Sequence, residues 1–307
     1  LEKNNLQIEC SFNLKNNNPT KLDSTLDVIK KFPLQTAGFA AGYHRTGPAD
    51  PALEREAVEL AKKADVVLLY IGLDEISESE GLDRPNMKLP GSQIRLLQMV
   101  SEANPHVVAV LSGGSPIEMP WIGQCEAVIH GYLSGQAGAA AMLNAILGKV
   151  NPSGKLNETY PLVYEDVPSA PYFPSRERNA EYREGLYVGY RYFETAGKPV
   201  RFPFGYGLSY TTFTYSDLTV NEQEASFTLA NTGEMDGAET AQLYVRAKCS
   251  GVYRPAKELK GFRKVFLKAG ESQKVTIPLD DKAFRYFNET TGRFEVEGGE
   301  YEILIGA

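Results

Sequence analysis

The stretch ADVVLLYIGL, residues 64–73, decides the fold class of the first part of the chain. From Val66 to Leu73 it is continuously apolar and contains several β-branched residues, which is typical of a parallel strand covered on both faces. The segment before it predicts a helix, because Asp50 can cap the helix, Pro51 can occupy its first position, and apolar residues recur at steps of three and four. A helix followed by a buried strand is the repeating unit of an α/β layered domain.

The same alternation continues to about residue 165. Ser92 is predicted to cap a second helix, QIRLLQMVSEA, which Asn104 and Pro105 end before the buried strand HVVAVLSGG. A third strand, EAVIHGYL, and a third helix, GQAGAAAMLNAILG, follow. The pattern predicts an α/β domain with a largely parallel sheet sandwiched by helices.

The helical period disappears after about residue 212. Seven short, often alternating runs follow, separated by Gly, Asn and Asp turn signals; they are TFTYSDLTV, EASFTLAN, TAQLYVRAK, FRKVFLK, QKVTIPL, RFEVEG and YEILIGA. They predict an all-β sandwich of the immunoglobulin or fibronectin type III kind. We therefore expect two domains, residues 1–212, with an N-terminal extension and an aromatic connecting segment at 166–211, and residues 213–307. The connecting segment contains too many aromatic residues for a flexible linker, so we expect it to pack against these domains or against a partner.

Composition excludes several classes of function. With 42% hydrophobic and 23% charged residues and a formal charge of −7, the 307-residue chain has the composition of a soluble globular protein, which argues against nucleic acid as a partner. No run approaches the roughly 20 apolar residues needed to span a bilayer, so a membrane is not an expected partner either. No signal peptide is visible in the first residues. Cys10, Cys125 and Cys249 are far apart, which predicts isolated thiols rather than disulfides or a zinc site and favours a reducing, cytoplasmic compartment.

The run SESEGLDR, residues 77–84, directly follows the first buried strand. Ligand sites in open parallel sheets form at the carboxyl ends of strands, so the position of Glu78, Glu80 and Asp83 favours function. A carboxylic acid in a sheltered cleft can stay protonated near neutral pH and donate its proton to a leaving oxygen. Gly81 would allow a tight turn beside such a group, and Arg84 could hold Asp83 so that the loop keeps one shape.

Other interpretations of the polar motifs stay open at this point. From spacing alone, a solvated acidic loop is the favoured interpretation of residues 77–84, and the frame of a calcium-binding EF-hand is absent. The run LSGGSP, residues 111–116, predicts a tight strand exit, since it matches neither GxSxG nor a P-loop. The sequence indicates no metal and no cofactor. Lys155 is expected to be structural.

The histidines and tyrosines also have both a structural and a functional interpretation. His44, His106 and His130 are isolated in sequence, so we expect core or boundary histidines rather than metal ligands. A stripe of tyrosines and arginines between residues 182 and 192 could form a wall on which sugars stack, but domain packing is the favoured interpretation.

Six ordered motifs carry a resemblance to a known family. They are EAVELAKKADVVLLYIGL, SESEGLDRPNMKLPGSQ, SGGSPIEMPWI, GKVNPSGKLNETYP, YREGLYVGYRYF and FPFGYGLSYTTFTY. Together they resemble the second and third domains of glycoside hydrolase family 3 β-glucosidases, from about residue 50 to the end. The resemblance implies a retaining enzyme in which a (β/α)8 barrel supplies an aspartate nucleophile and the α/β sandwich supplies a glutamate acid/base. By position that glutamate is most similar to Glu80, with Glu78 the less favoured choice.

The sequence departs from the family pattern in one respect. It contains no SDW-like or KHF-like motif, and it has no room for a barrel of roughly 250 residues beside these two domains. Its opening part resembles the subgroup in which these domains precede the barrel. We therefore expect the barrel to follow residue 307 or to be a separate chain, and this chain to be inactive alone, because retaining hydrolysis needs both carboxylates.

The resemblance leaves the substrate open. A β-glucoside or oligosaccharide is expected, cleaved at terminal non-reducing β-D-glucosyl residues, as in cellulose degradation, while β-xylosidases and other exo-acting β-glycosidases share these motifs. Two alternatives of other classes are a noncatalytic carbohydrate-binding or assembly module and a nucleotide-binding α/β protein, although no GxGxxG follows a strand and opens a helix. A homo-oligomer is also an open alternative.

Overall fold

The computed structural model describes residues 5–6, 23–74, 76–175 and 178–306. The chain divides into two compact units. The first consists of Leu1–Val150 with Leu162–Tyr164, and the second of Asn151–Pro161 with Glu165–Ala307. By compactness, most of the aromatic connecting segment therefore belongs with the second unit, and the domain boundary at residues 212 and 213 stays a prediction.

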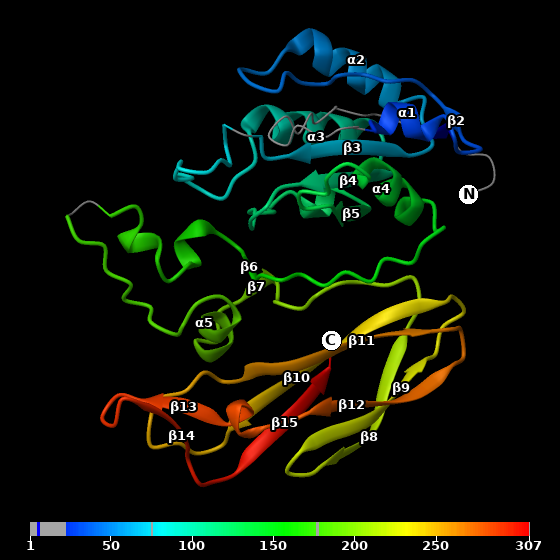
Figure 1. Cartoon of the computed structure of the whole chain (residues 1–307). Coiled ribbons are helices and arrows are strands. Elements are labelled where there is room, and N and C mark those ends of the chain that lie inside the picture. The colour runs from blue at the N-terminus through cyan, green and yellow to red at the C-terminus, as the bar shows by residue number, and fades with distance from the viewer. Residues whose placement is uncertain (1–4, 7–22, 75, 176–177, 307) are drawn as a thin grey trace. The chain divides into compact units, whose positions relative to one another are not determined.

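The first unit is built on a parallel sheet of three strands in the order β3-β4-β5 (Figure 1). The strands are β3 (Val67–Gly72), β4 (Val107–Ser112) and β5 (Ala127–His130), and they pair in parallel register. Every residue of β3 is buried, as its continuous apolar run predicted. The α/β fold class is confirmed.

Four α-helices accompany this sheet, α1 (Thr25–Ile29), α2 (Pro51–Ala61), α3 (Gly91–Ala103) and α4 (Gly138–Ile146). Helix α2 packs beside α3, and α1 packs beside α4. The predicted cap of α2 is confirmed, because the Asp50 carboxylate accepts a hydrogen bond of 2.8 Å from the N–H of Ala52. The predicted cap of α3 at Ser92 is wrong. Pro90 takes that position, with φ −53°, ψ 137° and no side-chain hydrogen bond, so the helix begins at Gly91, two residues earlier than a cap at Ser92 would allow.

The carboxyl end of β3 is fixed by two contacts with its neighbours. The buried amide of Gln93 donates to the carbonyl of Gly72 at 2.9 Å and accepts from its N–H at 2.8 Å. A Cβ atom on Gly72 would lie 2.2 Å from the Ser112 carbonyl oxygen, so only glycine allows β3 and β4 to approach this closely. The loop that follows β3 therefore starts from a rigid point.

Short elements complete the first unit. Strand β1 (Asn5–Leu6) pairs in parallel with β2 (Gln35–Thr36), and a single 3₁₀ turn, η1, covers Ile122–Gln124. The buried Asn104 ends α3 and donates to the carbonyls of Ala61 and Ala64, at 2.9 and 2.6 Å, so it joins the ends of two helices.

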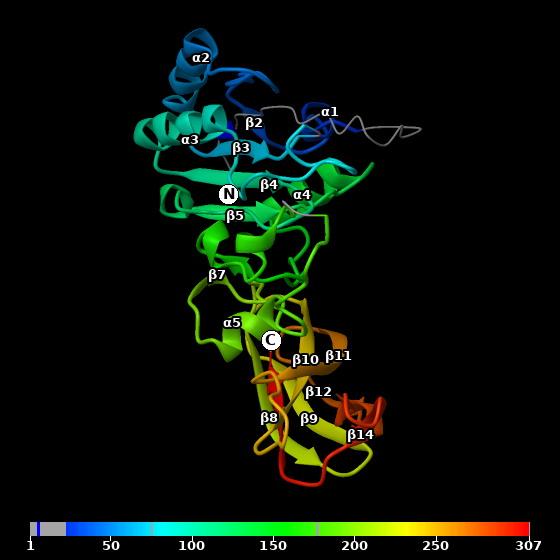
Figure 2. The same ribbon diagram turned by 90° about the vertical axis from the view of Figure 1, so that its left-hand side faces the viewer.

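The second unit contains the predicted β-sandwich. One sheet has the order β12-β9-β8 and the other β11-β10-β15, with a separate hairpin of β13 and β14. The strands are β8 (Phe213–Val220), β9 (Glu224–Asn231), β10 (Gly237–Ala247), β11 (Glu258–Leu267), β12 (Ser272–Pro278), β13 (Arg285–Asn288), β14 (Arg293–Val296) and β15 (Tyr301–Gly306). Both views show β8 beside β9 and β10 beside β11 (Figures 1 and 2). Alternate residues of the strands form one buried core that includes Phe227, Leu243 and Ile277.

The aromatic segment before the sandwich is folded. It contains the 3₁₀ turns η2 (Tyr164–Asp166) and η3 (Ala170–Tyr172), the helix α5 (Tyr190–Thr195), and β7 (Val200–Phe202), which pairs antiparallel with β6 (Tyr160–Pro161). The Tyr190 ring stacks on Phe204 at 4.9 Å, and its hydroxyl accepts from the N–H of Leu259 at 2.9 Å. Packing is therefore the role of this tyrosine, in agreement with the favoured interpretation.

Lys155 is structural, as expected. Its ammonium group donates to the carbonyl of Gly207 at 2.9 Å and lies 3.0 Å from the carboxylate of the buried Glu239. This ammonium compensates the negative charge of the buried Glu239 carboxylate. No helix in the described part of the chain is both long and apolar enough to cross a membrane. Cys125 and Cys249 are free thiols, and Cys10 lies outside the described residues.

Candidate functional site

The loop after β3 leaves the sheet through a turn built on Asp74. This buried side chain accepts hydrogen bonds from the N–H groups of Ser77 and Ile76, at 2.7 and 3.2 Å. The backbone carbonyl of Asp74 accepts a hydrogen bond of 2.8 Å from the N–H of Glu78. A carboxylate that bonds backbone N–H groups in this way forms an Asx turn, so the chain changes direction at a defined point after the strand.

Glu80 occupies the tip of this loop. The N–H of Leu82 donates to the carbonyl of Ser79 at 3.3 Å, and Gly81 has a φ of +78°, so Glu80 and Gly81 are the central residues of a tight turn. The Glu80 side chain is exposed. Within the described residues, no hydrogen bond or ion pair engages its carboxylate, which leaves both oxygens available to another molecule.

Glu78 is held, in contrast, against the loop that follows β4. Its carboxylate accepts a hydrogen bond of 2.6 Å from the N–H of Gly114 and a second one from the hydroxyl of Ser115. Arg84 donates to the same Ser115 hydroxyl oxygen at 2.6 Å and to the carbonyl of Pro116 at 3.3 Å. We call Glu78, Ser115 and Arg84 the Ser115 clamp, because Glu78 and Arg84, near the two ends of the run 77–84, both hydrogen-bond to the hydroxyl of Ser115.

The sequence analysis did not predict this role for Ser115. It treated residues 111–116 as a strand exit and expected Arg84 to hold Asp83, which is exposed and lies in the same loop. A signal for the clamp was present, since SESEGLDR and SGGSP each follow the carboxyl end of a strand, and parallel neighbours bring such ends together. The proposed hold of Arg84 on Asp83 stays a prediction.

The third strand of the sheet contributes His130 at its own carboxyl end. One ring nitrogen lies 3.3 Å from the carbonyl oxygen of Leu111, and the ring stacks on Tyr132 with centroids 4.0 Å apart. Burial lowers the pKa of His130 from its ordinary value, while the Leu111 carbonyl and the negative charge of Glu78 partly oppose that shift. His130 is therefore a boundary histidine, as expected, and it lies within electrostatic reach of the clamp.

The other two histidines face acidic partners at the surface. His44 lies 3.1 Å from Asp50, and His106 lies 3.0 Å from Glu126. Across the described ranges, no group of three or more His, Cys, Asp or Glu side chains could hold a metal ion.

The loops after β3 and β5 expose apolar side chains. Ile76 and Leu82 are 65% and 63% exposed, and Leu133 from the loop after β5 is also exposed. Exposed apolar side chains that flank a polar group are typical of a surface that another molecule covers. The arrangement thus combines one available carboxylate with an apolar rim and a rigid base.

Comparison with known proteins shows the class to which this arrangement belongs. The model described as the glycosyl hydrolase family 3 C-terminal domain matches residues 7–210, and that of the fibronectin type III-like domain matches residues 239–307. The fold is therefore that of the domains named in these two models. The chain belongs to glycosyl hydrolase family 3, as its six motifs predicted.

Characterised relatives cover almost the whole chain. It is 48% identical over 295 residues to an exo-α-(1→6)-L-arabinopyranosidase of Bifidobacterium breve, a match that spans 94% of this chain and 39% of the relative. It is 44% identical to the thermostable β-glucosidase B of Acetivibrio thermocellus, over 94% of this chain and 40% of the relative.

A solved structure has the same fold. The crystal structure of a family 3 β-glucosidase from Bifidobacterium adolescentis matches 99% of this chain, and 47% of its own length, with a TM-score of 0.93 at 41% identity. The chain thus spans about two fifths to one half of the length of these relatives. The order in which a barrel and the two domains follow one another stays a prediction.

Proposed function

We propose that this chain supplies the general acid/base of a retaining β-glucosidase and that Glu80 is that residue. The observation that supports this most is the contrast between the two neighbouring acids. Both oxygens of Glu78 accept hydrogen bonds within the loop base, whereas the carboxylate of Glu80 stands at the tip without a partner among the described residues. An acid/base must exchange its proton with substrate and water, which requires a carboxyl group that is free to do so.

The second carboxylate of the reaction is proposed to come from a (β/α)8 barrel. Retaining hydrolysis needs two carboxyl groups about 5–5.5 Å apart, one of which attacks the anomeric carbon. Glu78 is a poor candidate for that attack, because Gly114 and Ser115 already bind both of its oxygens. The greater length of the relatives supports a further domain that carries the nucleophilic aspartate.

In this scheme Glu80 acts twice. As the aspartate of the barrel attacks the anomeric carbon, the Glu80 carboxyl gives its proton to the glycosidic oxygen, the bond from that oxygen to the anomeric carbon breaks, and the alcohol leaves. The Glu80 carboxylate then takes a proton from water while the water oxygen attacks the anomeric carbon and releases the aspartate. The Ser115 clamp would hold the loop so that Glu80 points at the same atom in both steps.

The chain alone is proposed to be inactive. Retaining hydrolysis needs the nucleophilic carboxylate that this proposal places on the barrel, and the surface of the barrel would also cover the exposed Glu80 and exclude water from it. The exposed side chains of Ile76 and Leu82 provide an apolar rim on which such a surface could pack. The barrel would then supply both the nucleophile and the shelter.

The substrate is proposed to be a β-glucoside cleaved from the non-reducing end. A second candidate is an α-L-arabinopyranoside, because the relatives at 48% and 47% identity are named exo-α-(1→6)-L-arabinopyranosidases. Both sugars carry an equatorial 1,2-trans glycosidic bond, so the same pair of carboxylates serves either. β-Xylosides stay an alternative within the family, and a noncatalytic carbohydrate-binding or assembly module is the alternative outside catalysis.

A reconstitution assay tests the proposal. The chain is assayed with nitrophenyl β-D-glucoside, β-D-xyloside and α-L-arabinopyranoside, alone and after addition of a family 3 barrel chain. We expect hydrolysis only in the mixture, and a much lower steady-state turnover when the chain carries Glu80→Gln, because release of the glycosyl enzyme then lacks its base. Full activity of the chain alone would contradict the split of the two carboxylates. Reconstitution by Glu80→Gln as well as by the natural chain would contradict the role of Glu80.

A further inference from the structure

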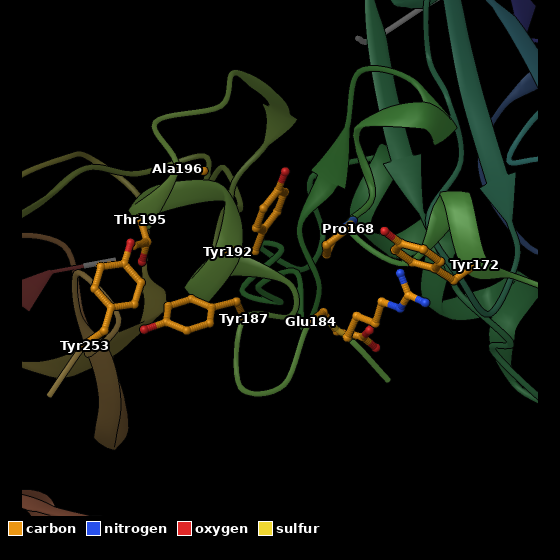
Figure 3. A pocket seen from close by; sticks show the side chains of 9 residues that line it. Pro168, Tyr172, Glu184, Tyr187, Tyr192, Thr195, Ala196 and Tyr253 are labelled. Atoms are coloured by element: carbon orange, nitrogen blue, oxygen red, sulfur yellow. The ribbon is translucent and has the colours of Figure 1, made fainter. Parts of the chain in front are cut away.

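A groove of about 450 Å³ lies within the second unit (Figure 3). It is lined by the aromatic segment and by Tyr253, which precedes β11. Its volume falls in the range of small-ligand sites. Four tyrosines dominate the lining, together with one arginine and one glutamate; these residues are Tyr172, Arg183, Glu184, Tyr187, Tyr192 and Tyr253. We call this feature the tyrosine groove.

The walls of the groove are aromatic and accessible. The rings of Tyr187 and Tyr253 contact each other in a tilted arrangement, with centroids 5.1 Å apart, and Tyr253 is 77% exposed. On the other wall the Tyr172 ring lies 4.5 Å from the guanidinium of Arg183 and is 44% exposed. Figure 3 shows Tyr192 between these two groups. Aromatic rings offer broad apolar faces at little cost in conformational entropy, which suits a flat ligand.

Specific contacts hold α5 against the segment that contains Tyr253, and these two elements form one wall of the groove. The hydroxyl of Thr195 accepts from the N–H of Ala256 at 2.9 Å, and the ammonium of Lys257 lies 2.9 Å from Glu194. Tyr190, in the same helix, is buried and accepts from the N–H of Leu259. These bonds fix both elements, so Tyr187 and Tyr253 are preorganised for a ligand.

The charges of the groove narrow the class of ligand. Arg183 is engaged by Glu181 at 2.6 Å, and it also occupies the face of Tyr172. The carboxylate of Glu184 has no hydrogen-bond or ion-pair partner in the part of the chain that the structure describes. An anionic ligand would face this uncompensated carboxylate, because the charge of Arg183 is already paired with that of Glu181. A neutral ligand with hydroxyl donors avoids this repulsion and can hydrogen-bond to the carboxylate.

We propose that the tyrosine groove binds a neutral pyranoside, in the form of a short oligosaccharide. The apolar C–H face of a pyranose ring fits against the exposed tyrosine rings, and adjacent hydroxyls can donate to the two oxygens of Glu184. This site lies wholly in the second unit and does not depend on the role of Glu80. It would give the chain an affinity for the kind of molecule that family 3 enzymes cleave, even without catalysis.

A titration followed by NMR tests the groove directly. Cellobiose and cellotetraose are added to the chain, with inorganic phosphate and choline as the anionic and cationic probes. We expect dissociation constants of about 0.1–10 mM for the sugars, corresponding to the weak end of specific binding, and shifts confined to residues of the groove. Phosphate and choline should cause none of these shifts.

Variants separate the groove from the surface around it. Tyr253→Ala and Glu184→Gln should weaken sugar binding at least tenfold. Tyr182→Ala is the matched control, because Tyr182 is 83% exposed and belongs to the same segment but does not line the groove. Sugar-dependent shifts at the groove without shifts in residues 77–84 would distinguish this site from the proposed catalytic one. Absence of sugar-dependent shifts in the groove, or equal weakening by Tyr182→Ala, would overturn the proposal. Binding of a barrel chain to this surface without any sugar binding would also overturn it.

Discussion

The carboxylate of Glu78 accepts a hydrogen bond from the N–H of Gly114, at 2.6 Å, and another from the hydroxyl of Ser115. This relationship joins two loops that follow neighbouring parallel strands, β3 and β4. It also separates the roles of two acids that stand two positions apart in the sequence. Glu78 holds the base of the loop, and Glu80 is the acid that is exposed at its tip.

Glu78→Gln should loosen the loop without removing Glu80. An amide has only one oxygen to accept from Gly114 and Ser115, and it lacks the charge that strengthens both bonds, so local stability should fall by about 1–3 kcal/mol. Hydrogen–deuterium exchange of the amides of residues 77–84 measures this directly. Glu59→Gln is the matched control, since Glu59 forms an exposed pair with Lys62 on α2. Unchanged exchange in Glu78→Gln would show that the clamp does not hold the loop.

His130 should contribute a pH dependence to the stability of the first unit. Burial lowers its pKa below the ordinary value of 6.5, so the unfolded chain takes up the proton first as the pH falls. The contribution of His130 is therefore fully present above about pH 6.5 and is lost as the pH falls through the pKa of the folded state. Unfolding followed by denaturant at several pH values should show this loss, and His130→Gln should lack it.

The same histidine reports on the position of Glu78. The negative charge of Glu78 opposes the lowering of the His130 pKa, so Glu78→Gln should lower that pKa further. An NMR titration of the His130 ring gives both values. A midpoint at or above 6.5 in the natural chain, or a rise after Glu78→Gln, would contradict the geometry described here.

Gly72→Ala should destabilise the first unit strongly. Its Cβ atom would lie 2.2 Å from the Ser112 carbonyl, which is main chain and cannot swing away. The two hydrogen bonds between Gly72 and Gln93 would also be disturbed, and we expect a loss of at least about 3 kcal/mol. Urea unfolding measures the change. Gly91→Ala is the control, because nothing lies within 4 Å of the corresponding Cβ atom at the start of α3 and alanine favours a helix. Equal stability of the two variants would refute the close approach of β3 and β4.

Much of the fold was predictable from the sequence because its signals are local. The apolar run 66–73, the cap at Asp50 and the stop at Asn104 predicted the strands and helices, and the alternation after residue 212 predicted the sandwich strands. One exception was the start of α3, where Pro90 and not Ser92 precedes the first helical residue. A second was β13, Arg285–Asn288, which none of the seven predicted runs contains.

The site was less predictable because its contacts are long-range. Glu78 and Ser115 are separated by 37 positions, and their hydrogen bond depends on the register of two strands. The tyrosines of the segment 182–192 look alike in sequence, yet Tyr190 is buried while Tyr187 and Tyr192 line a groove. Only the packing of α5 against the sandwich strands separates these roles.

The most direct test of the central claim is the response of Glu80→Ala to the leaving group, measured in the enzyme completed by its barrel. The turnover of natural glucosides should fall about 10²–10⁴-fold, because their alcohol must be protonated as it leaves. Cleavage of dinitrophenyl glucoside should be largely spared in its first step, and azide, which needs no base, should restore turnover by attacking the glycosyl enzyme. Equal loss on both substrates without azide rescue, or this same pattern in Glu78→Ala instead, would contradict the assignment of Glu80 as the acid/base.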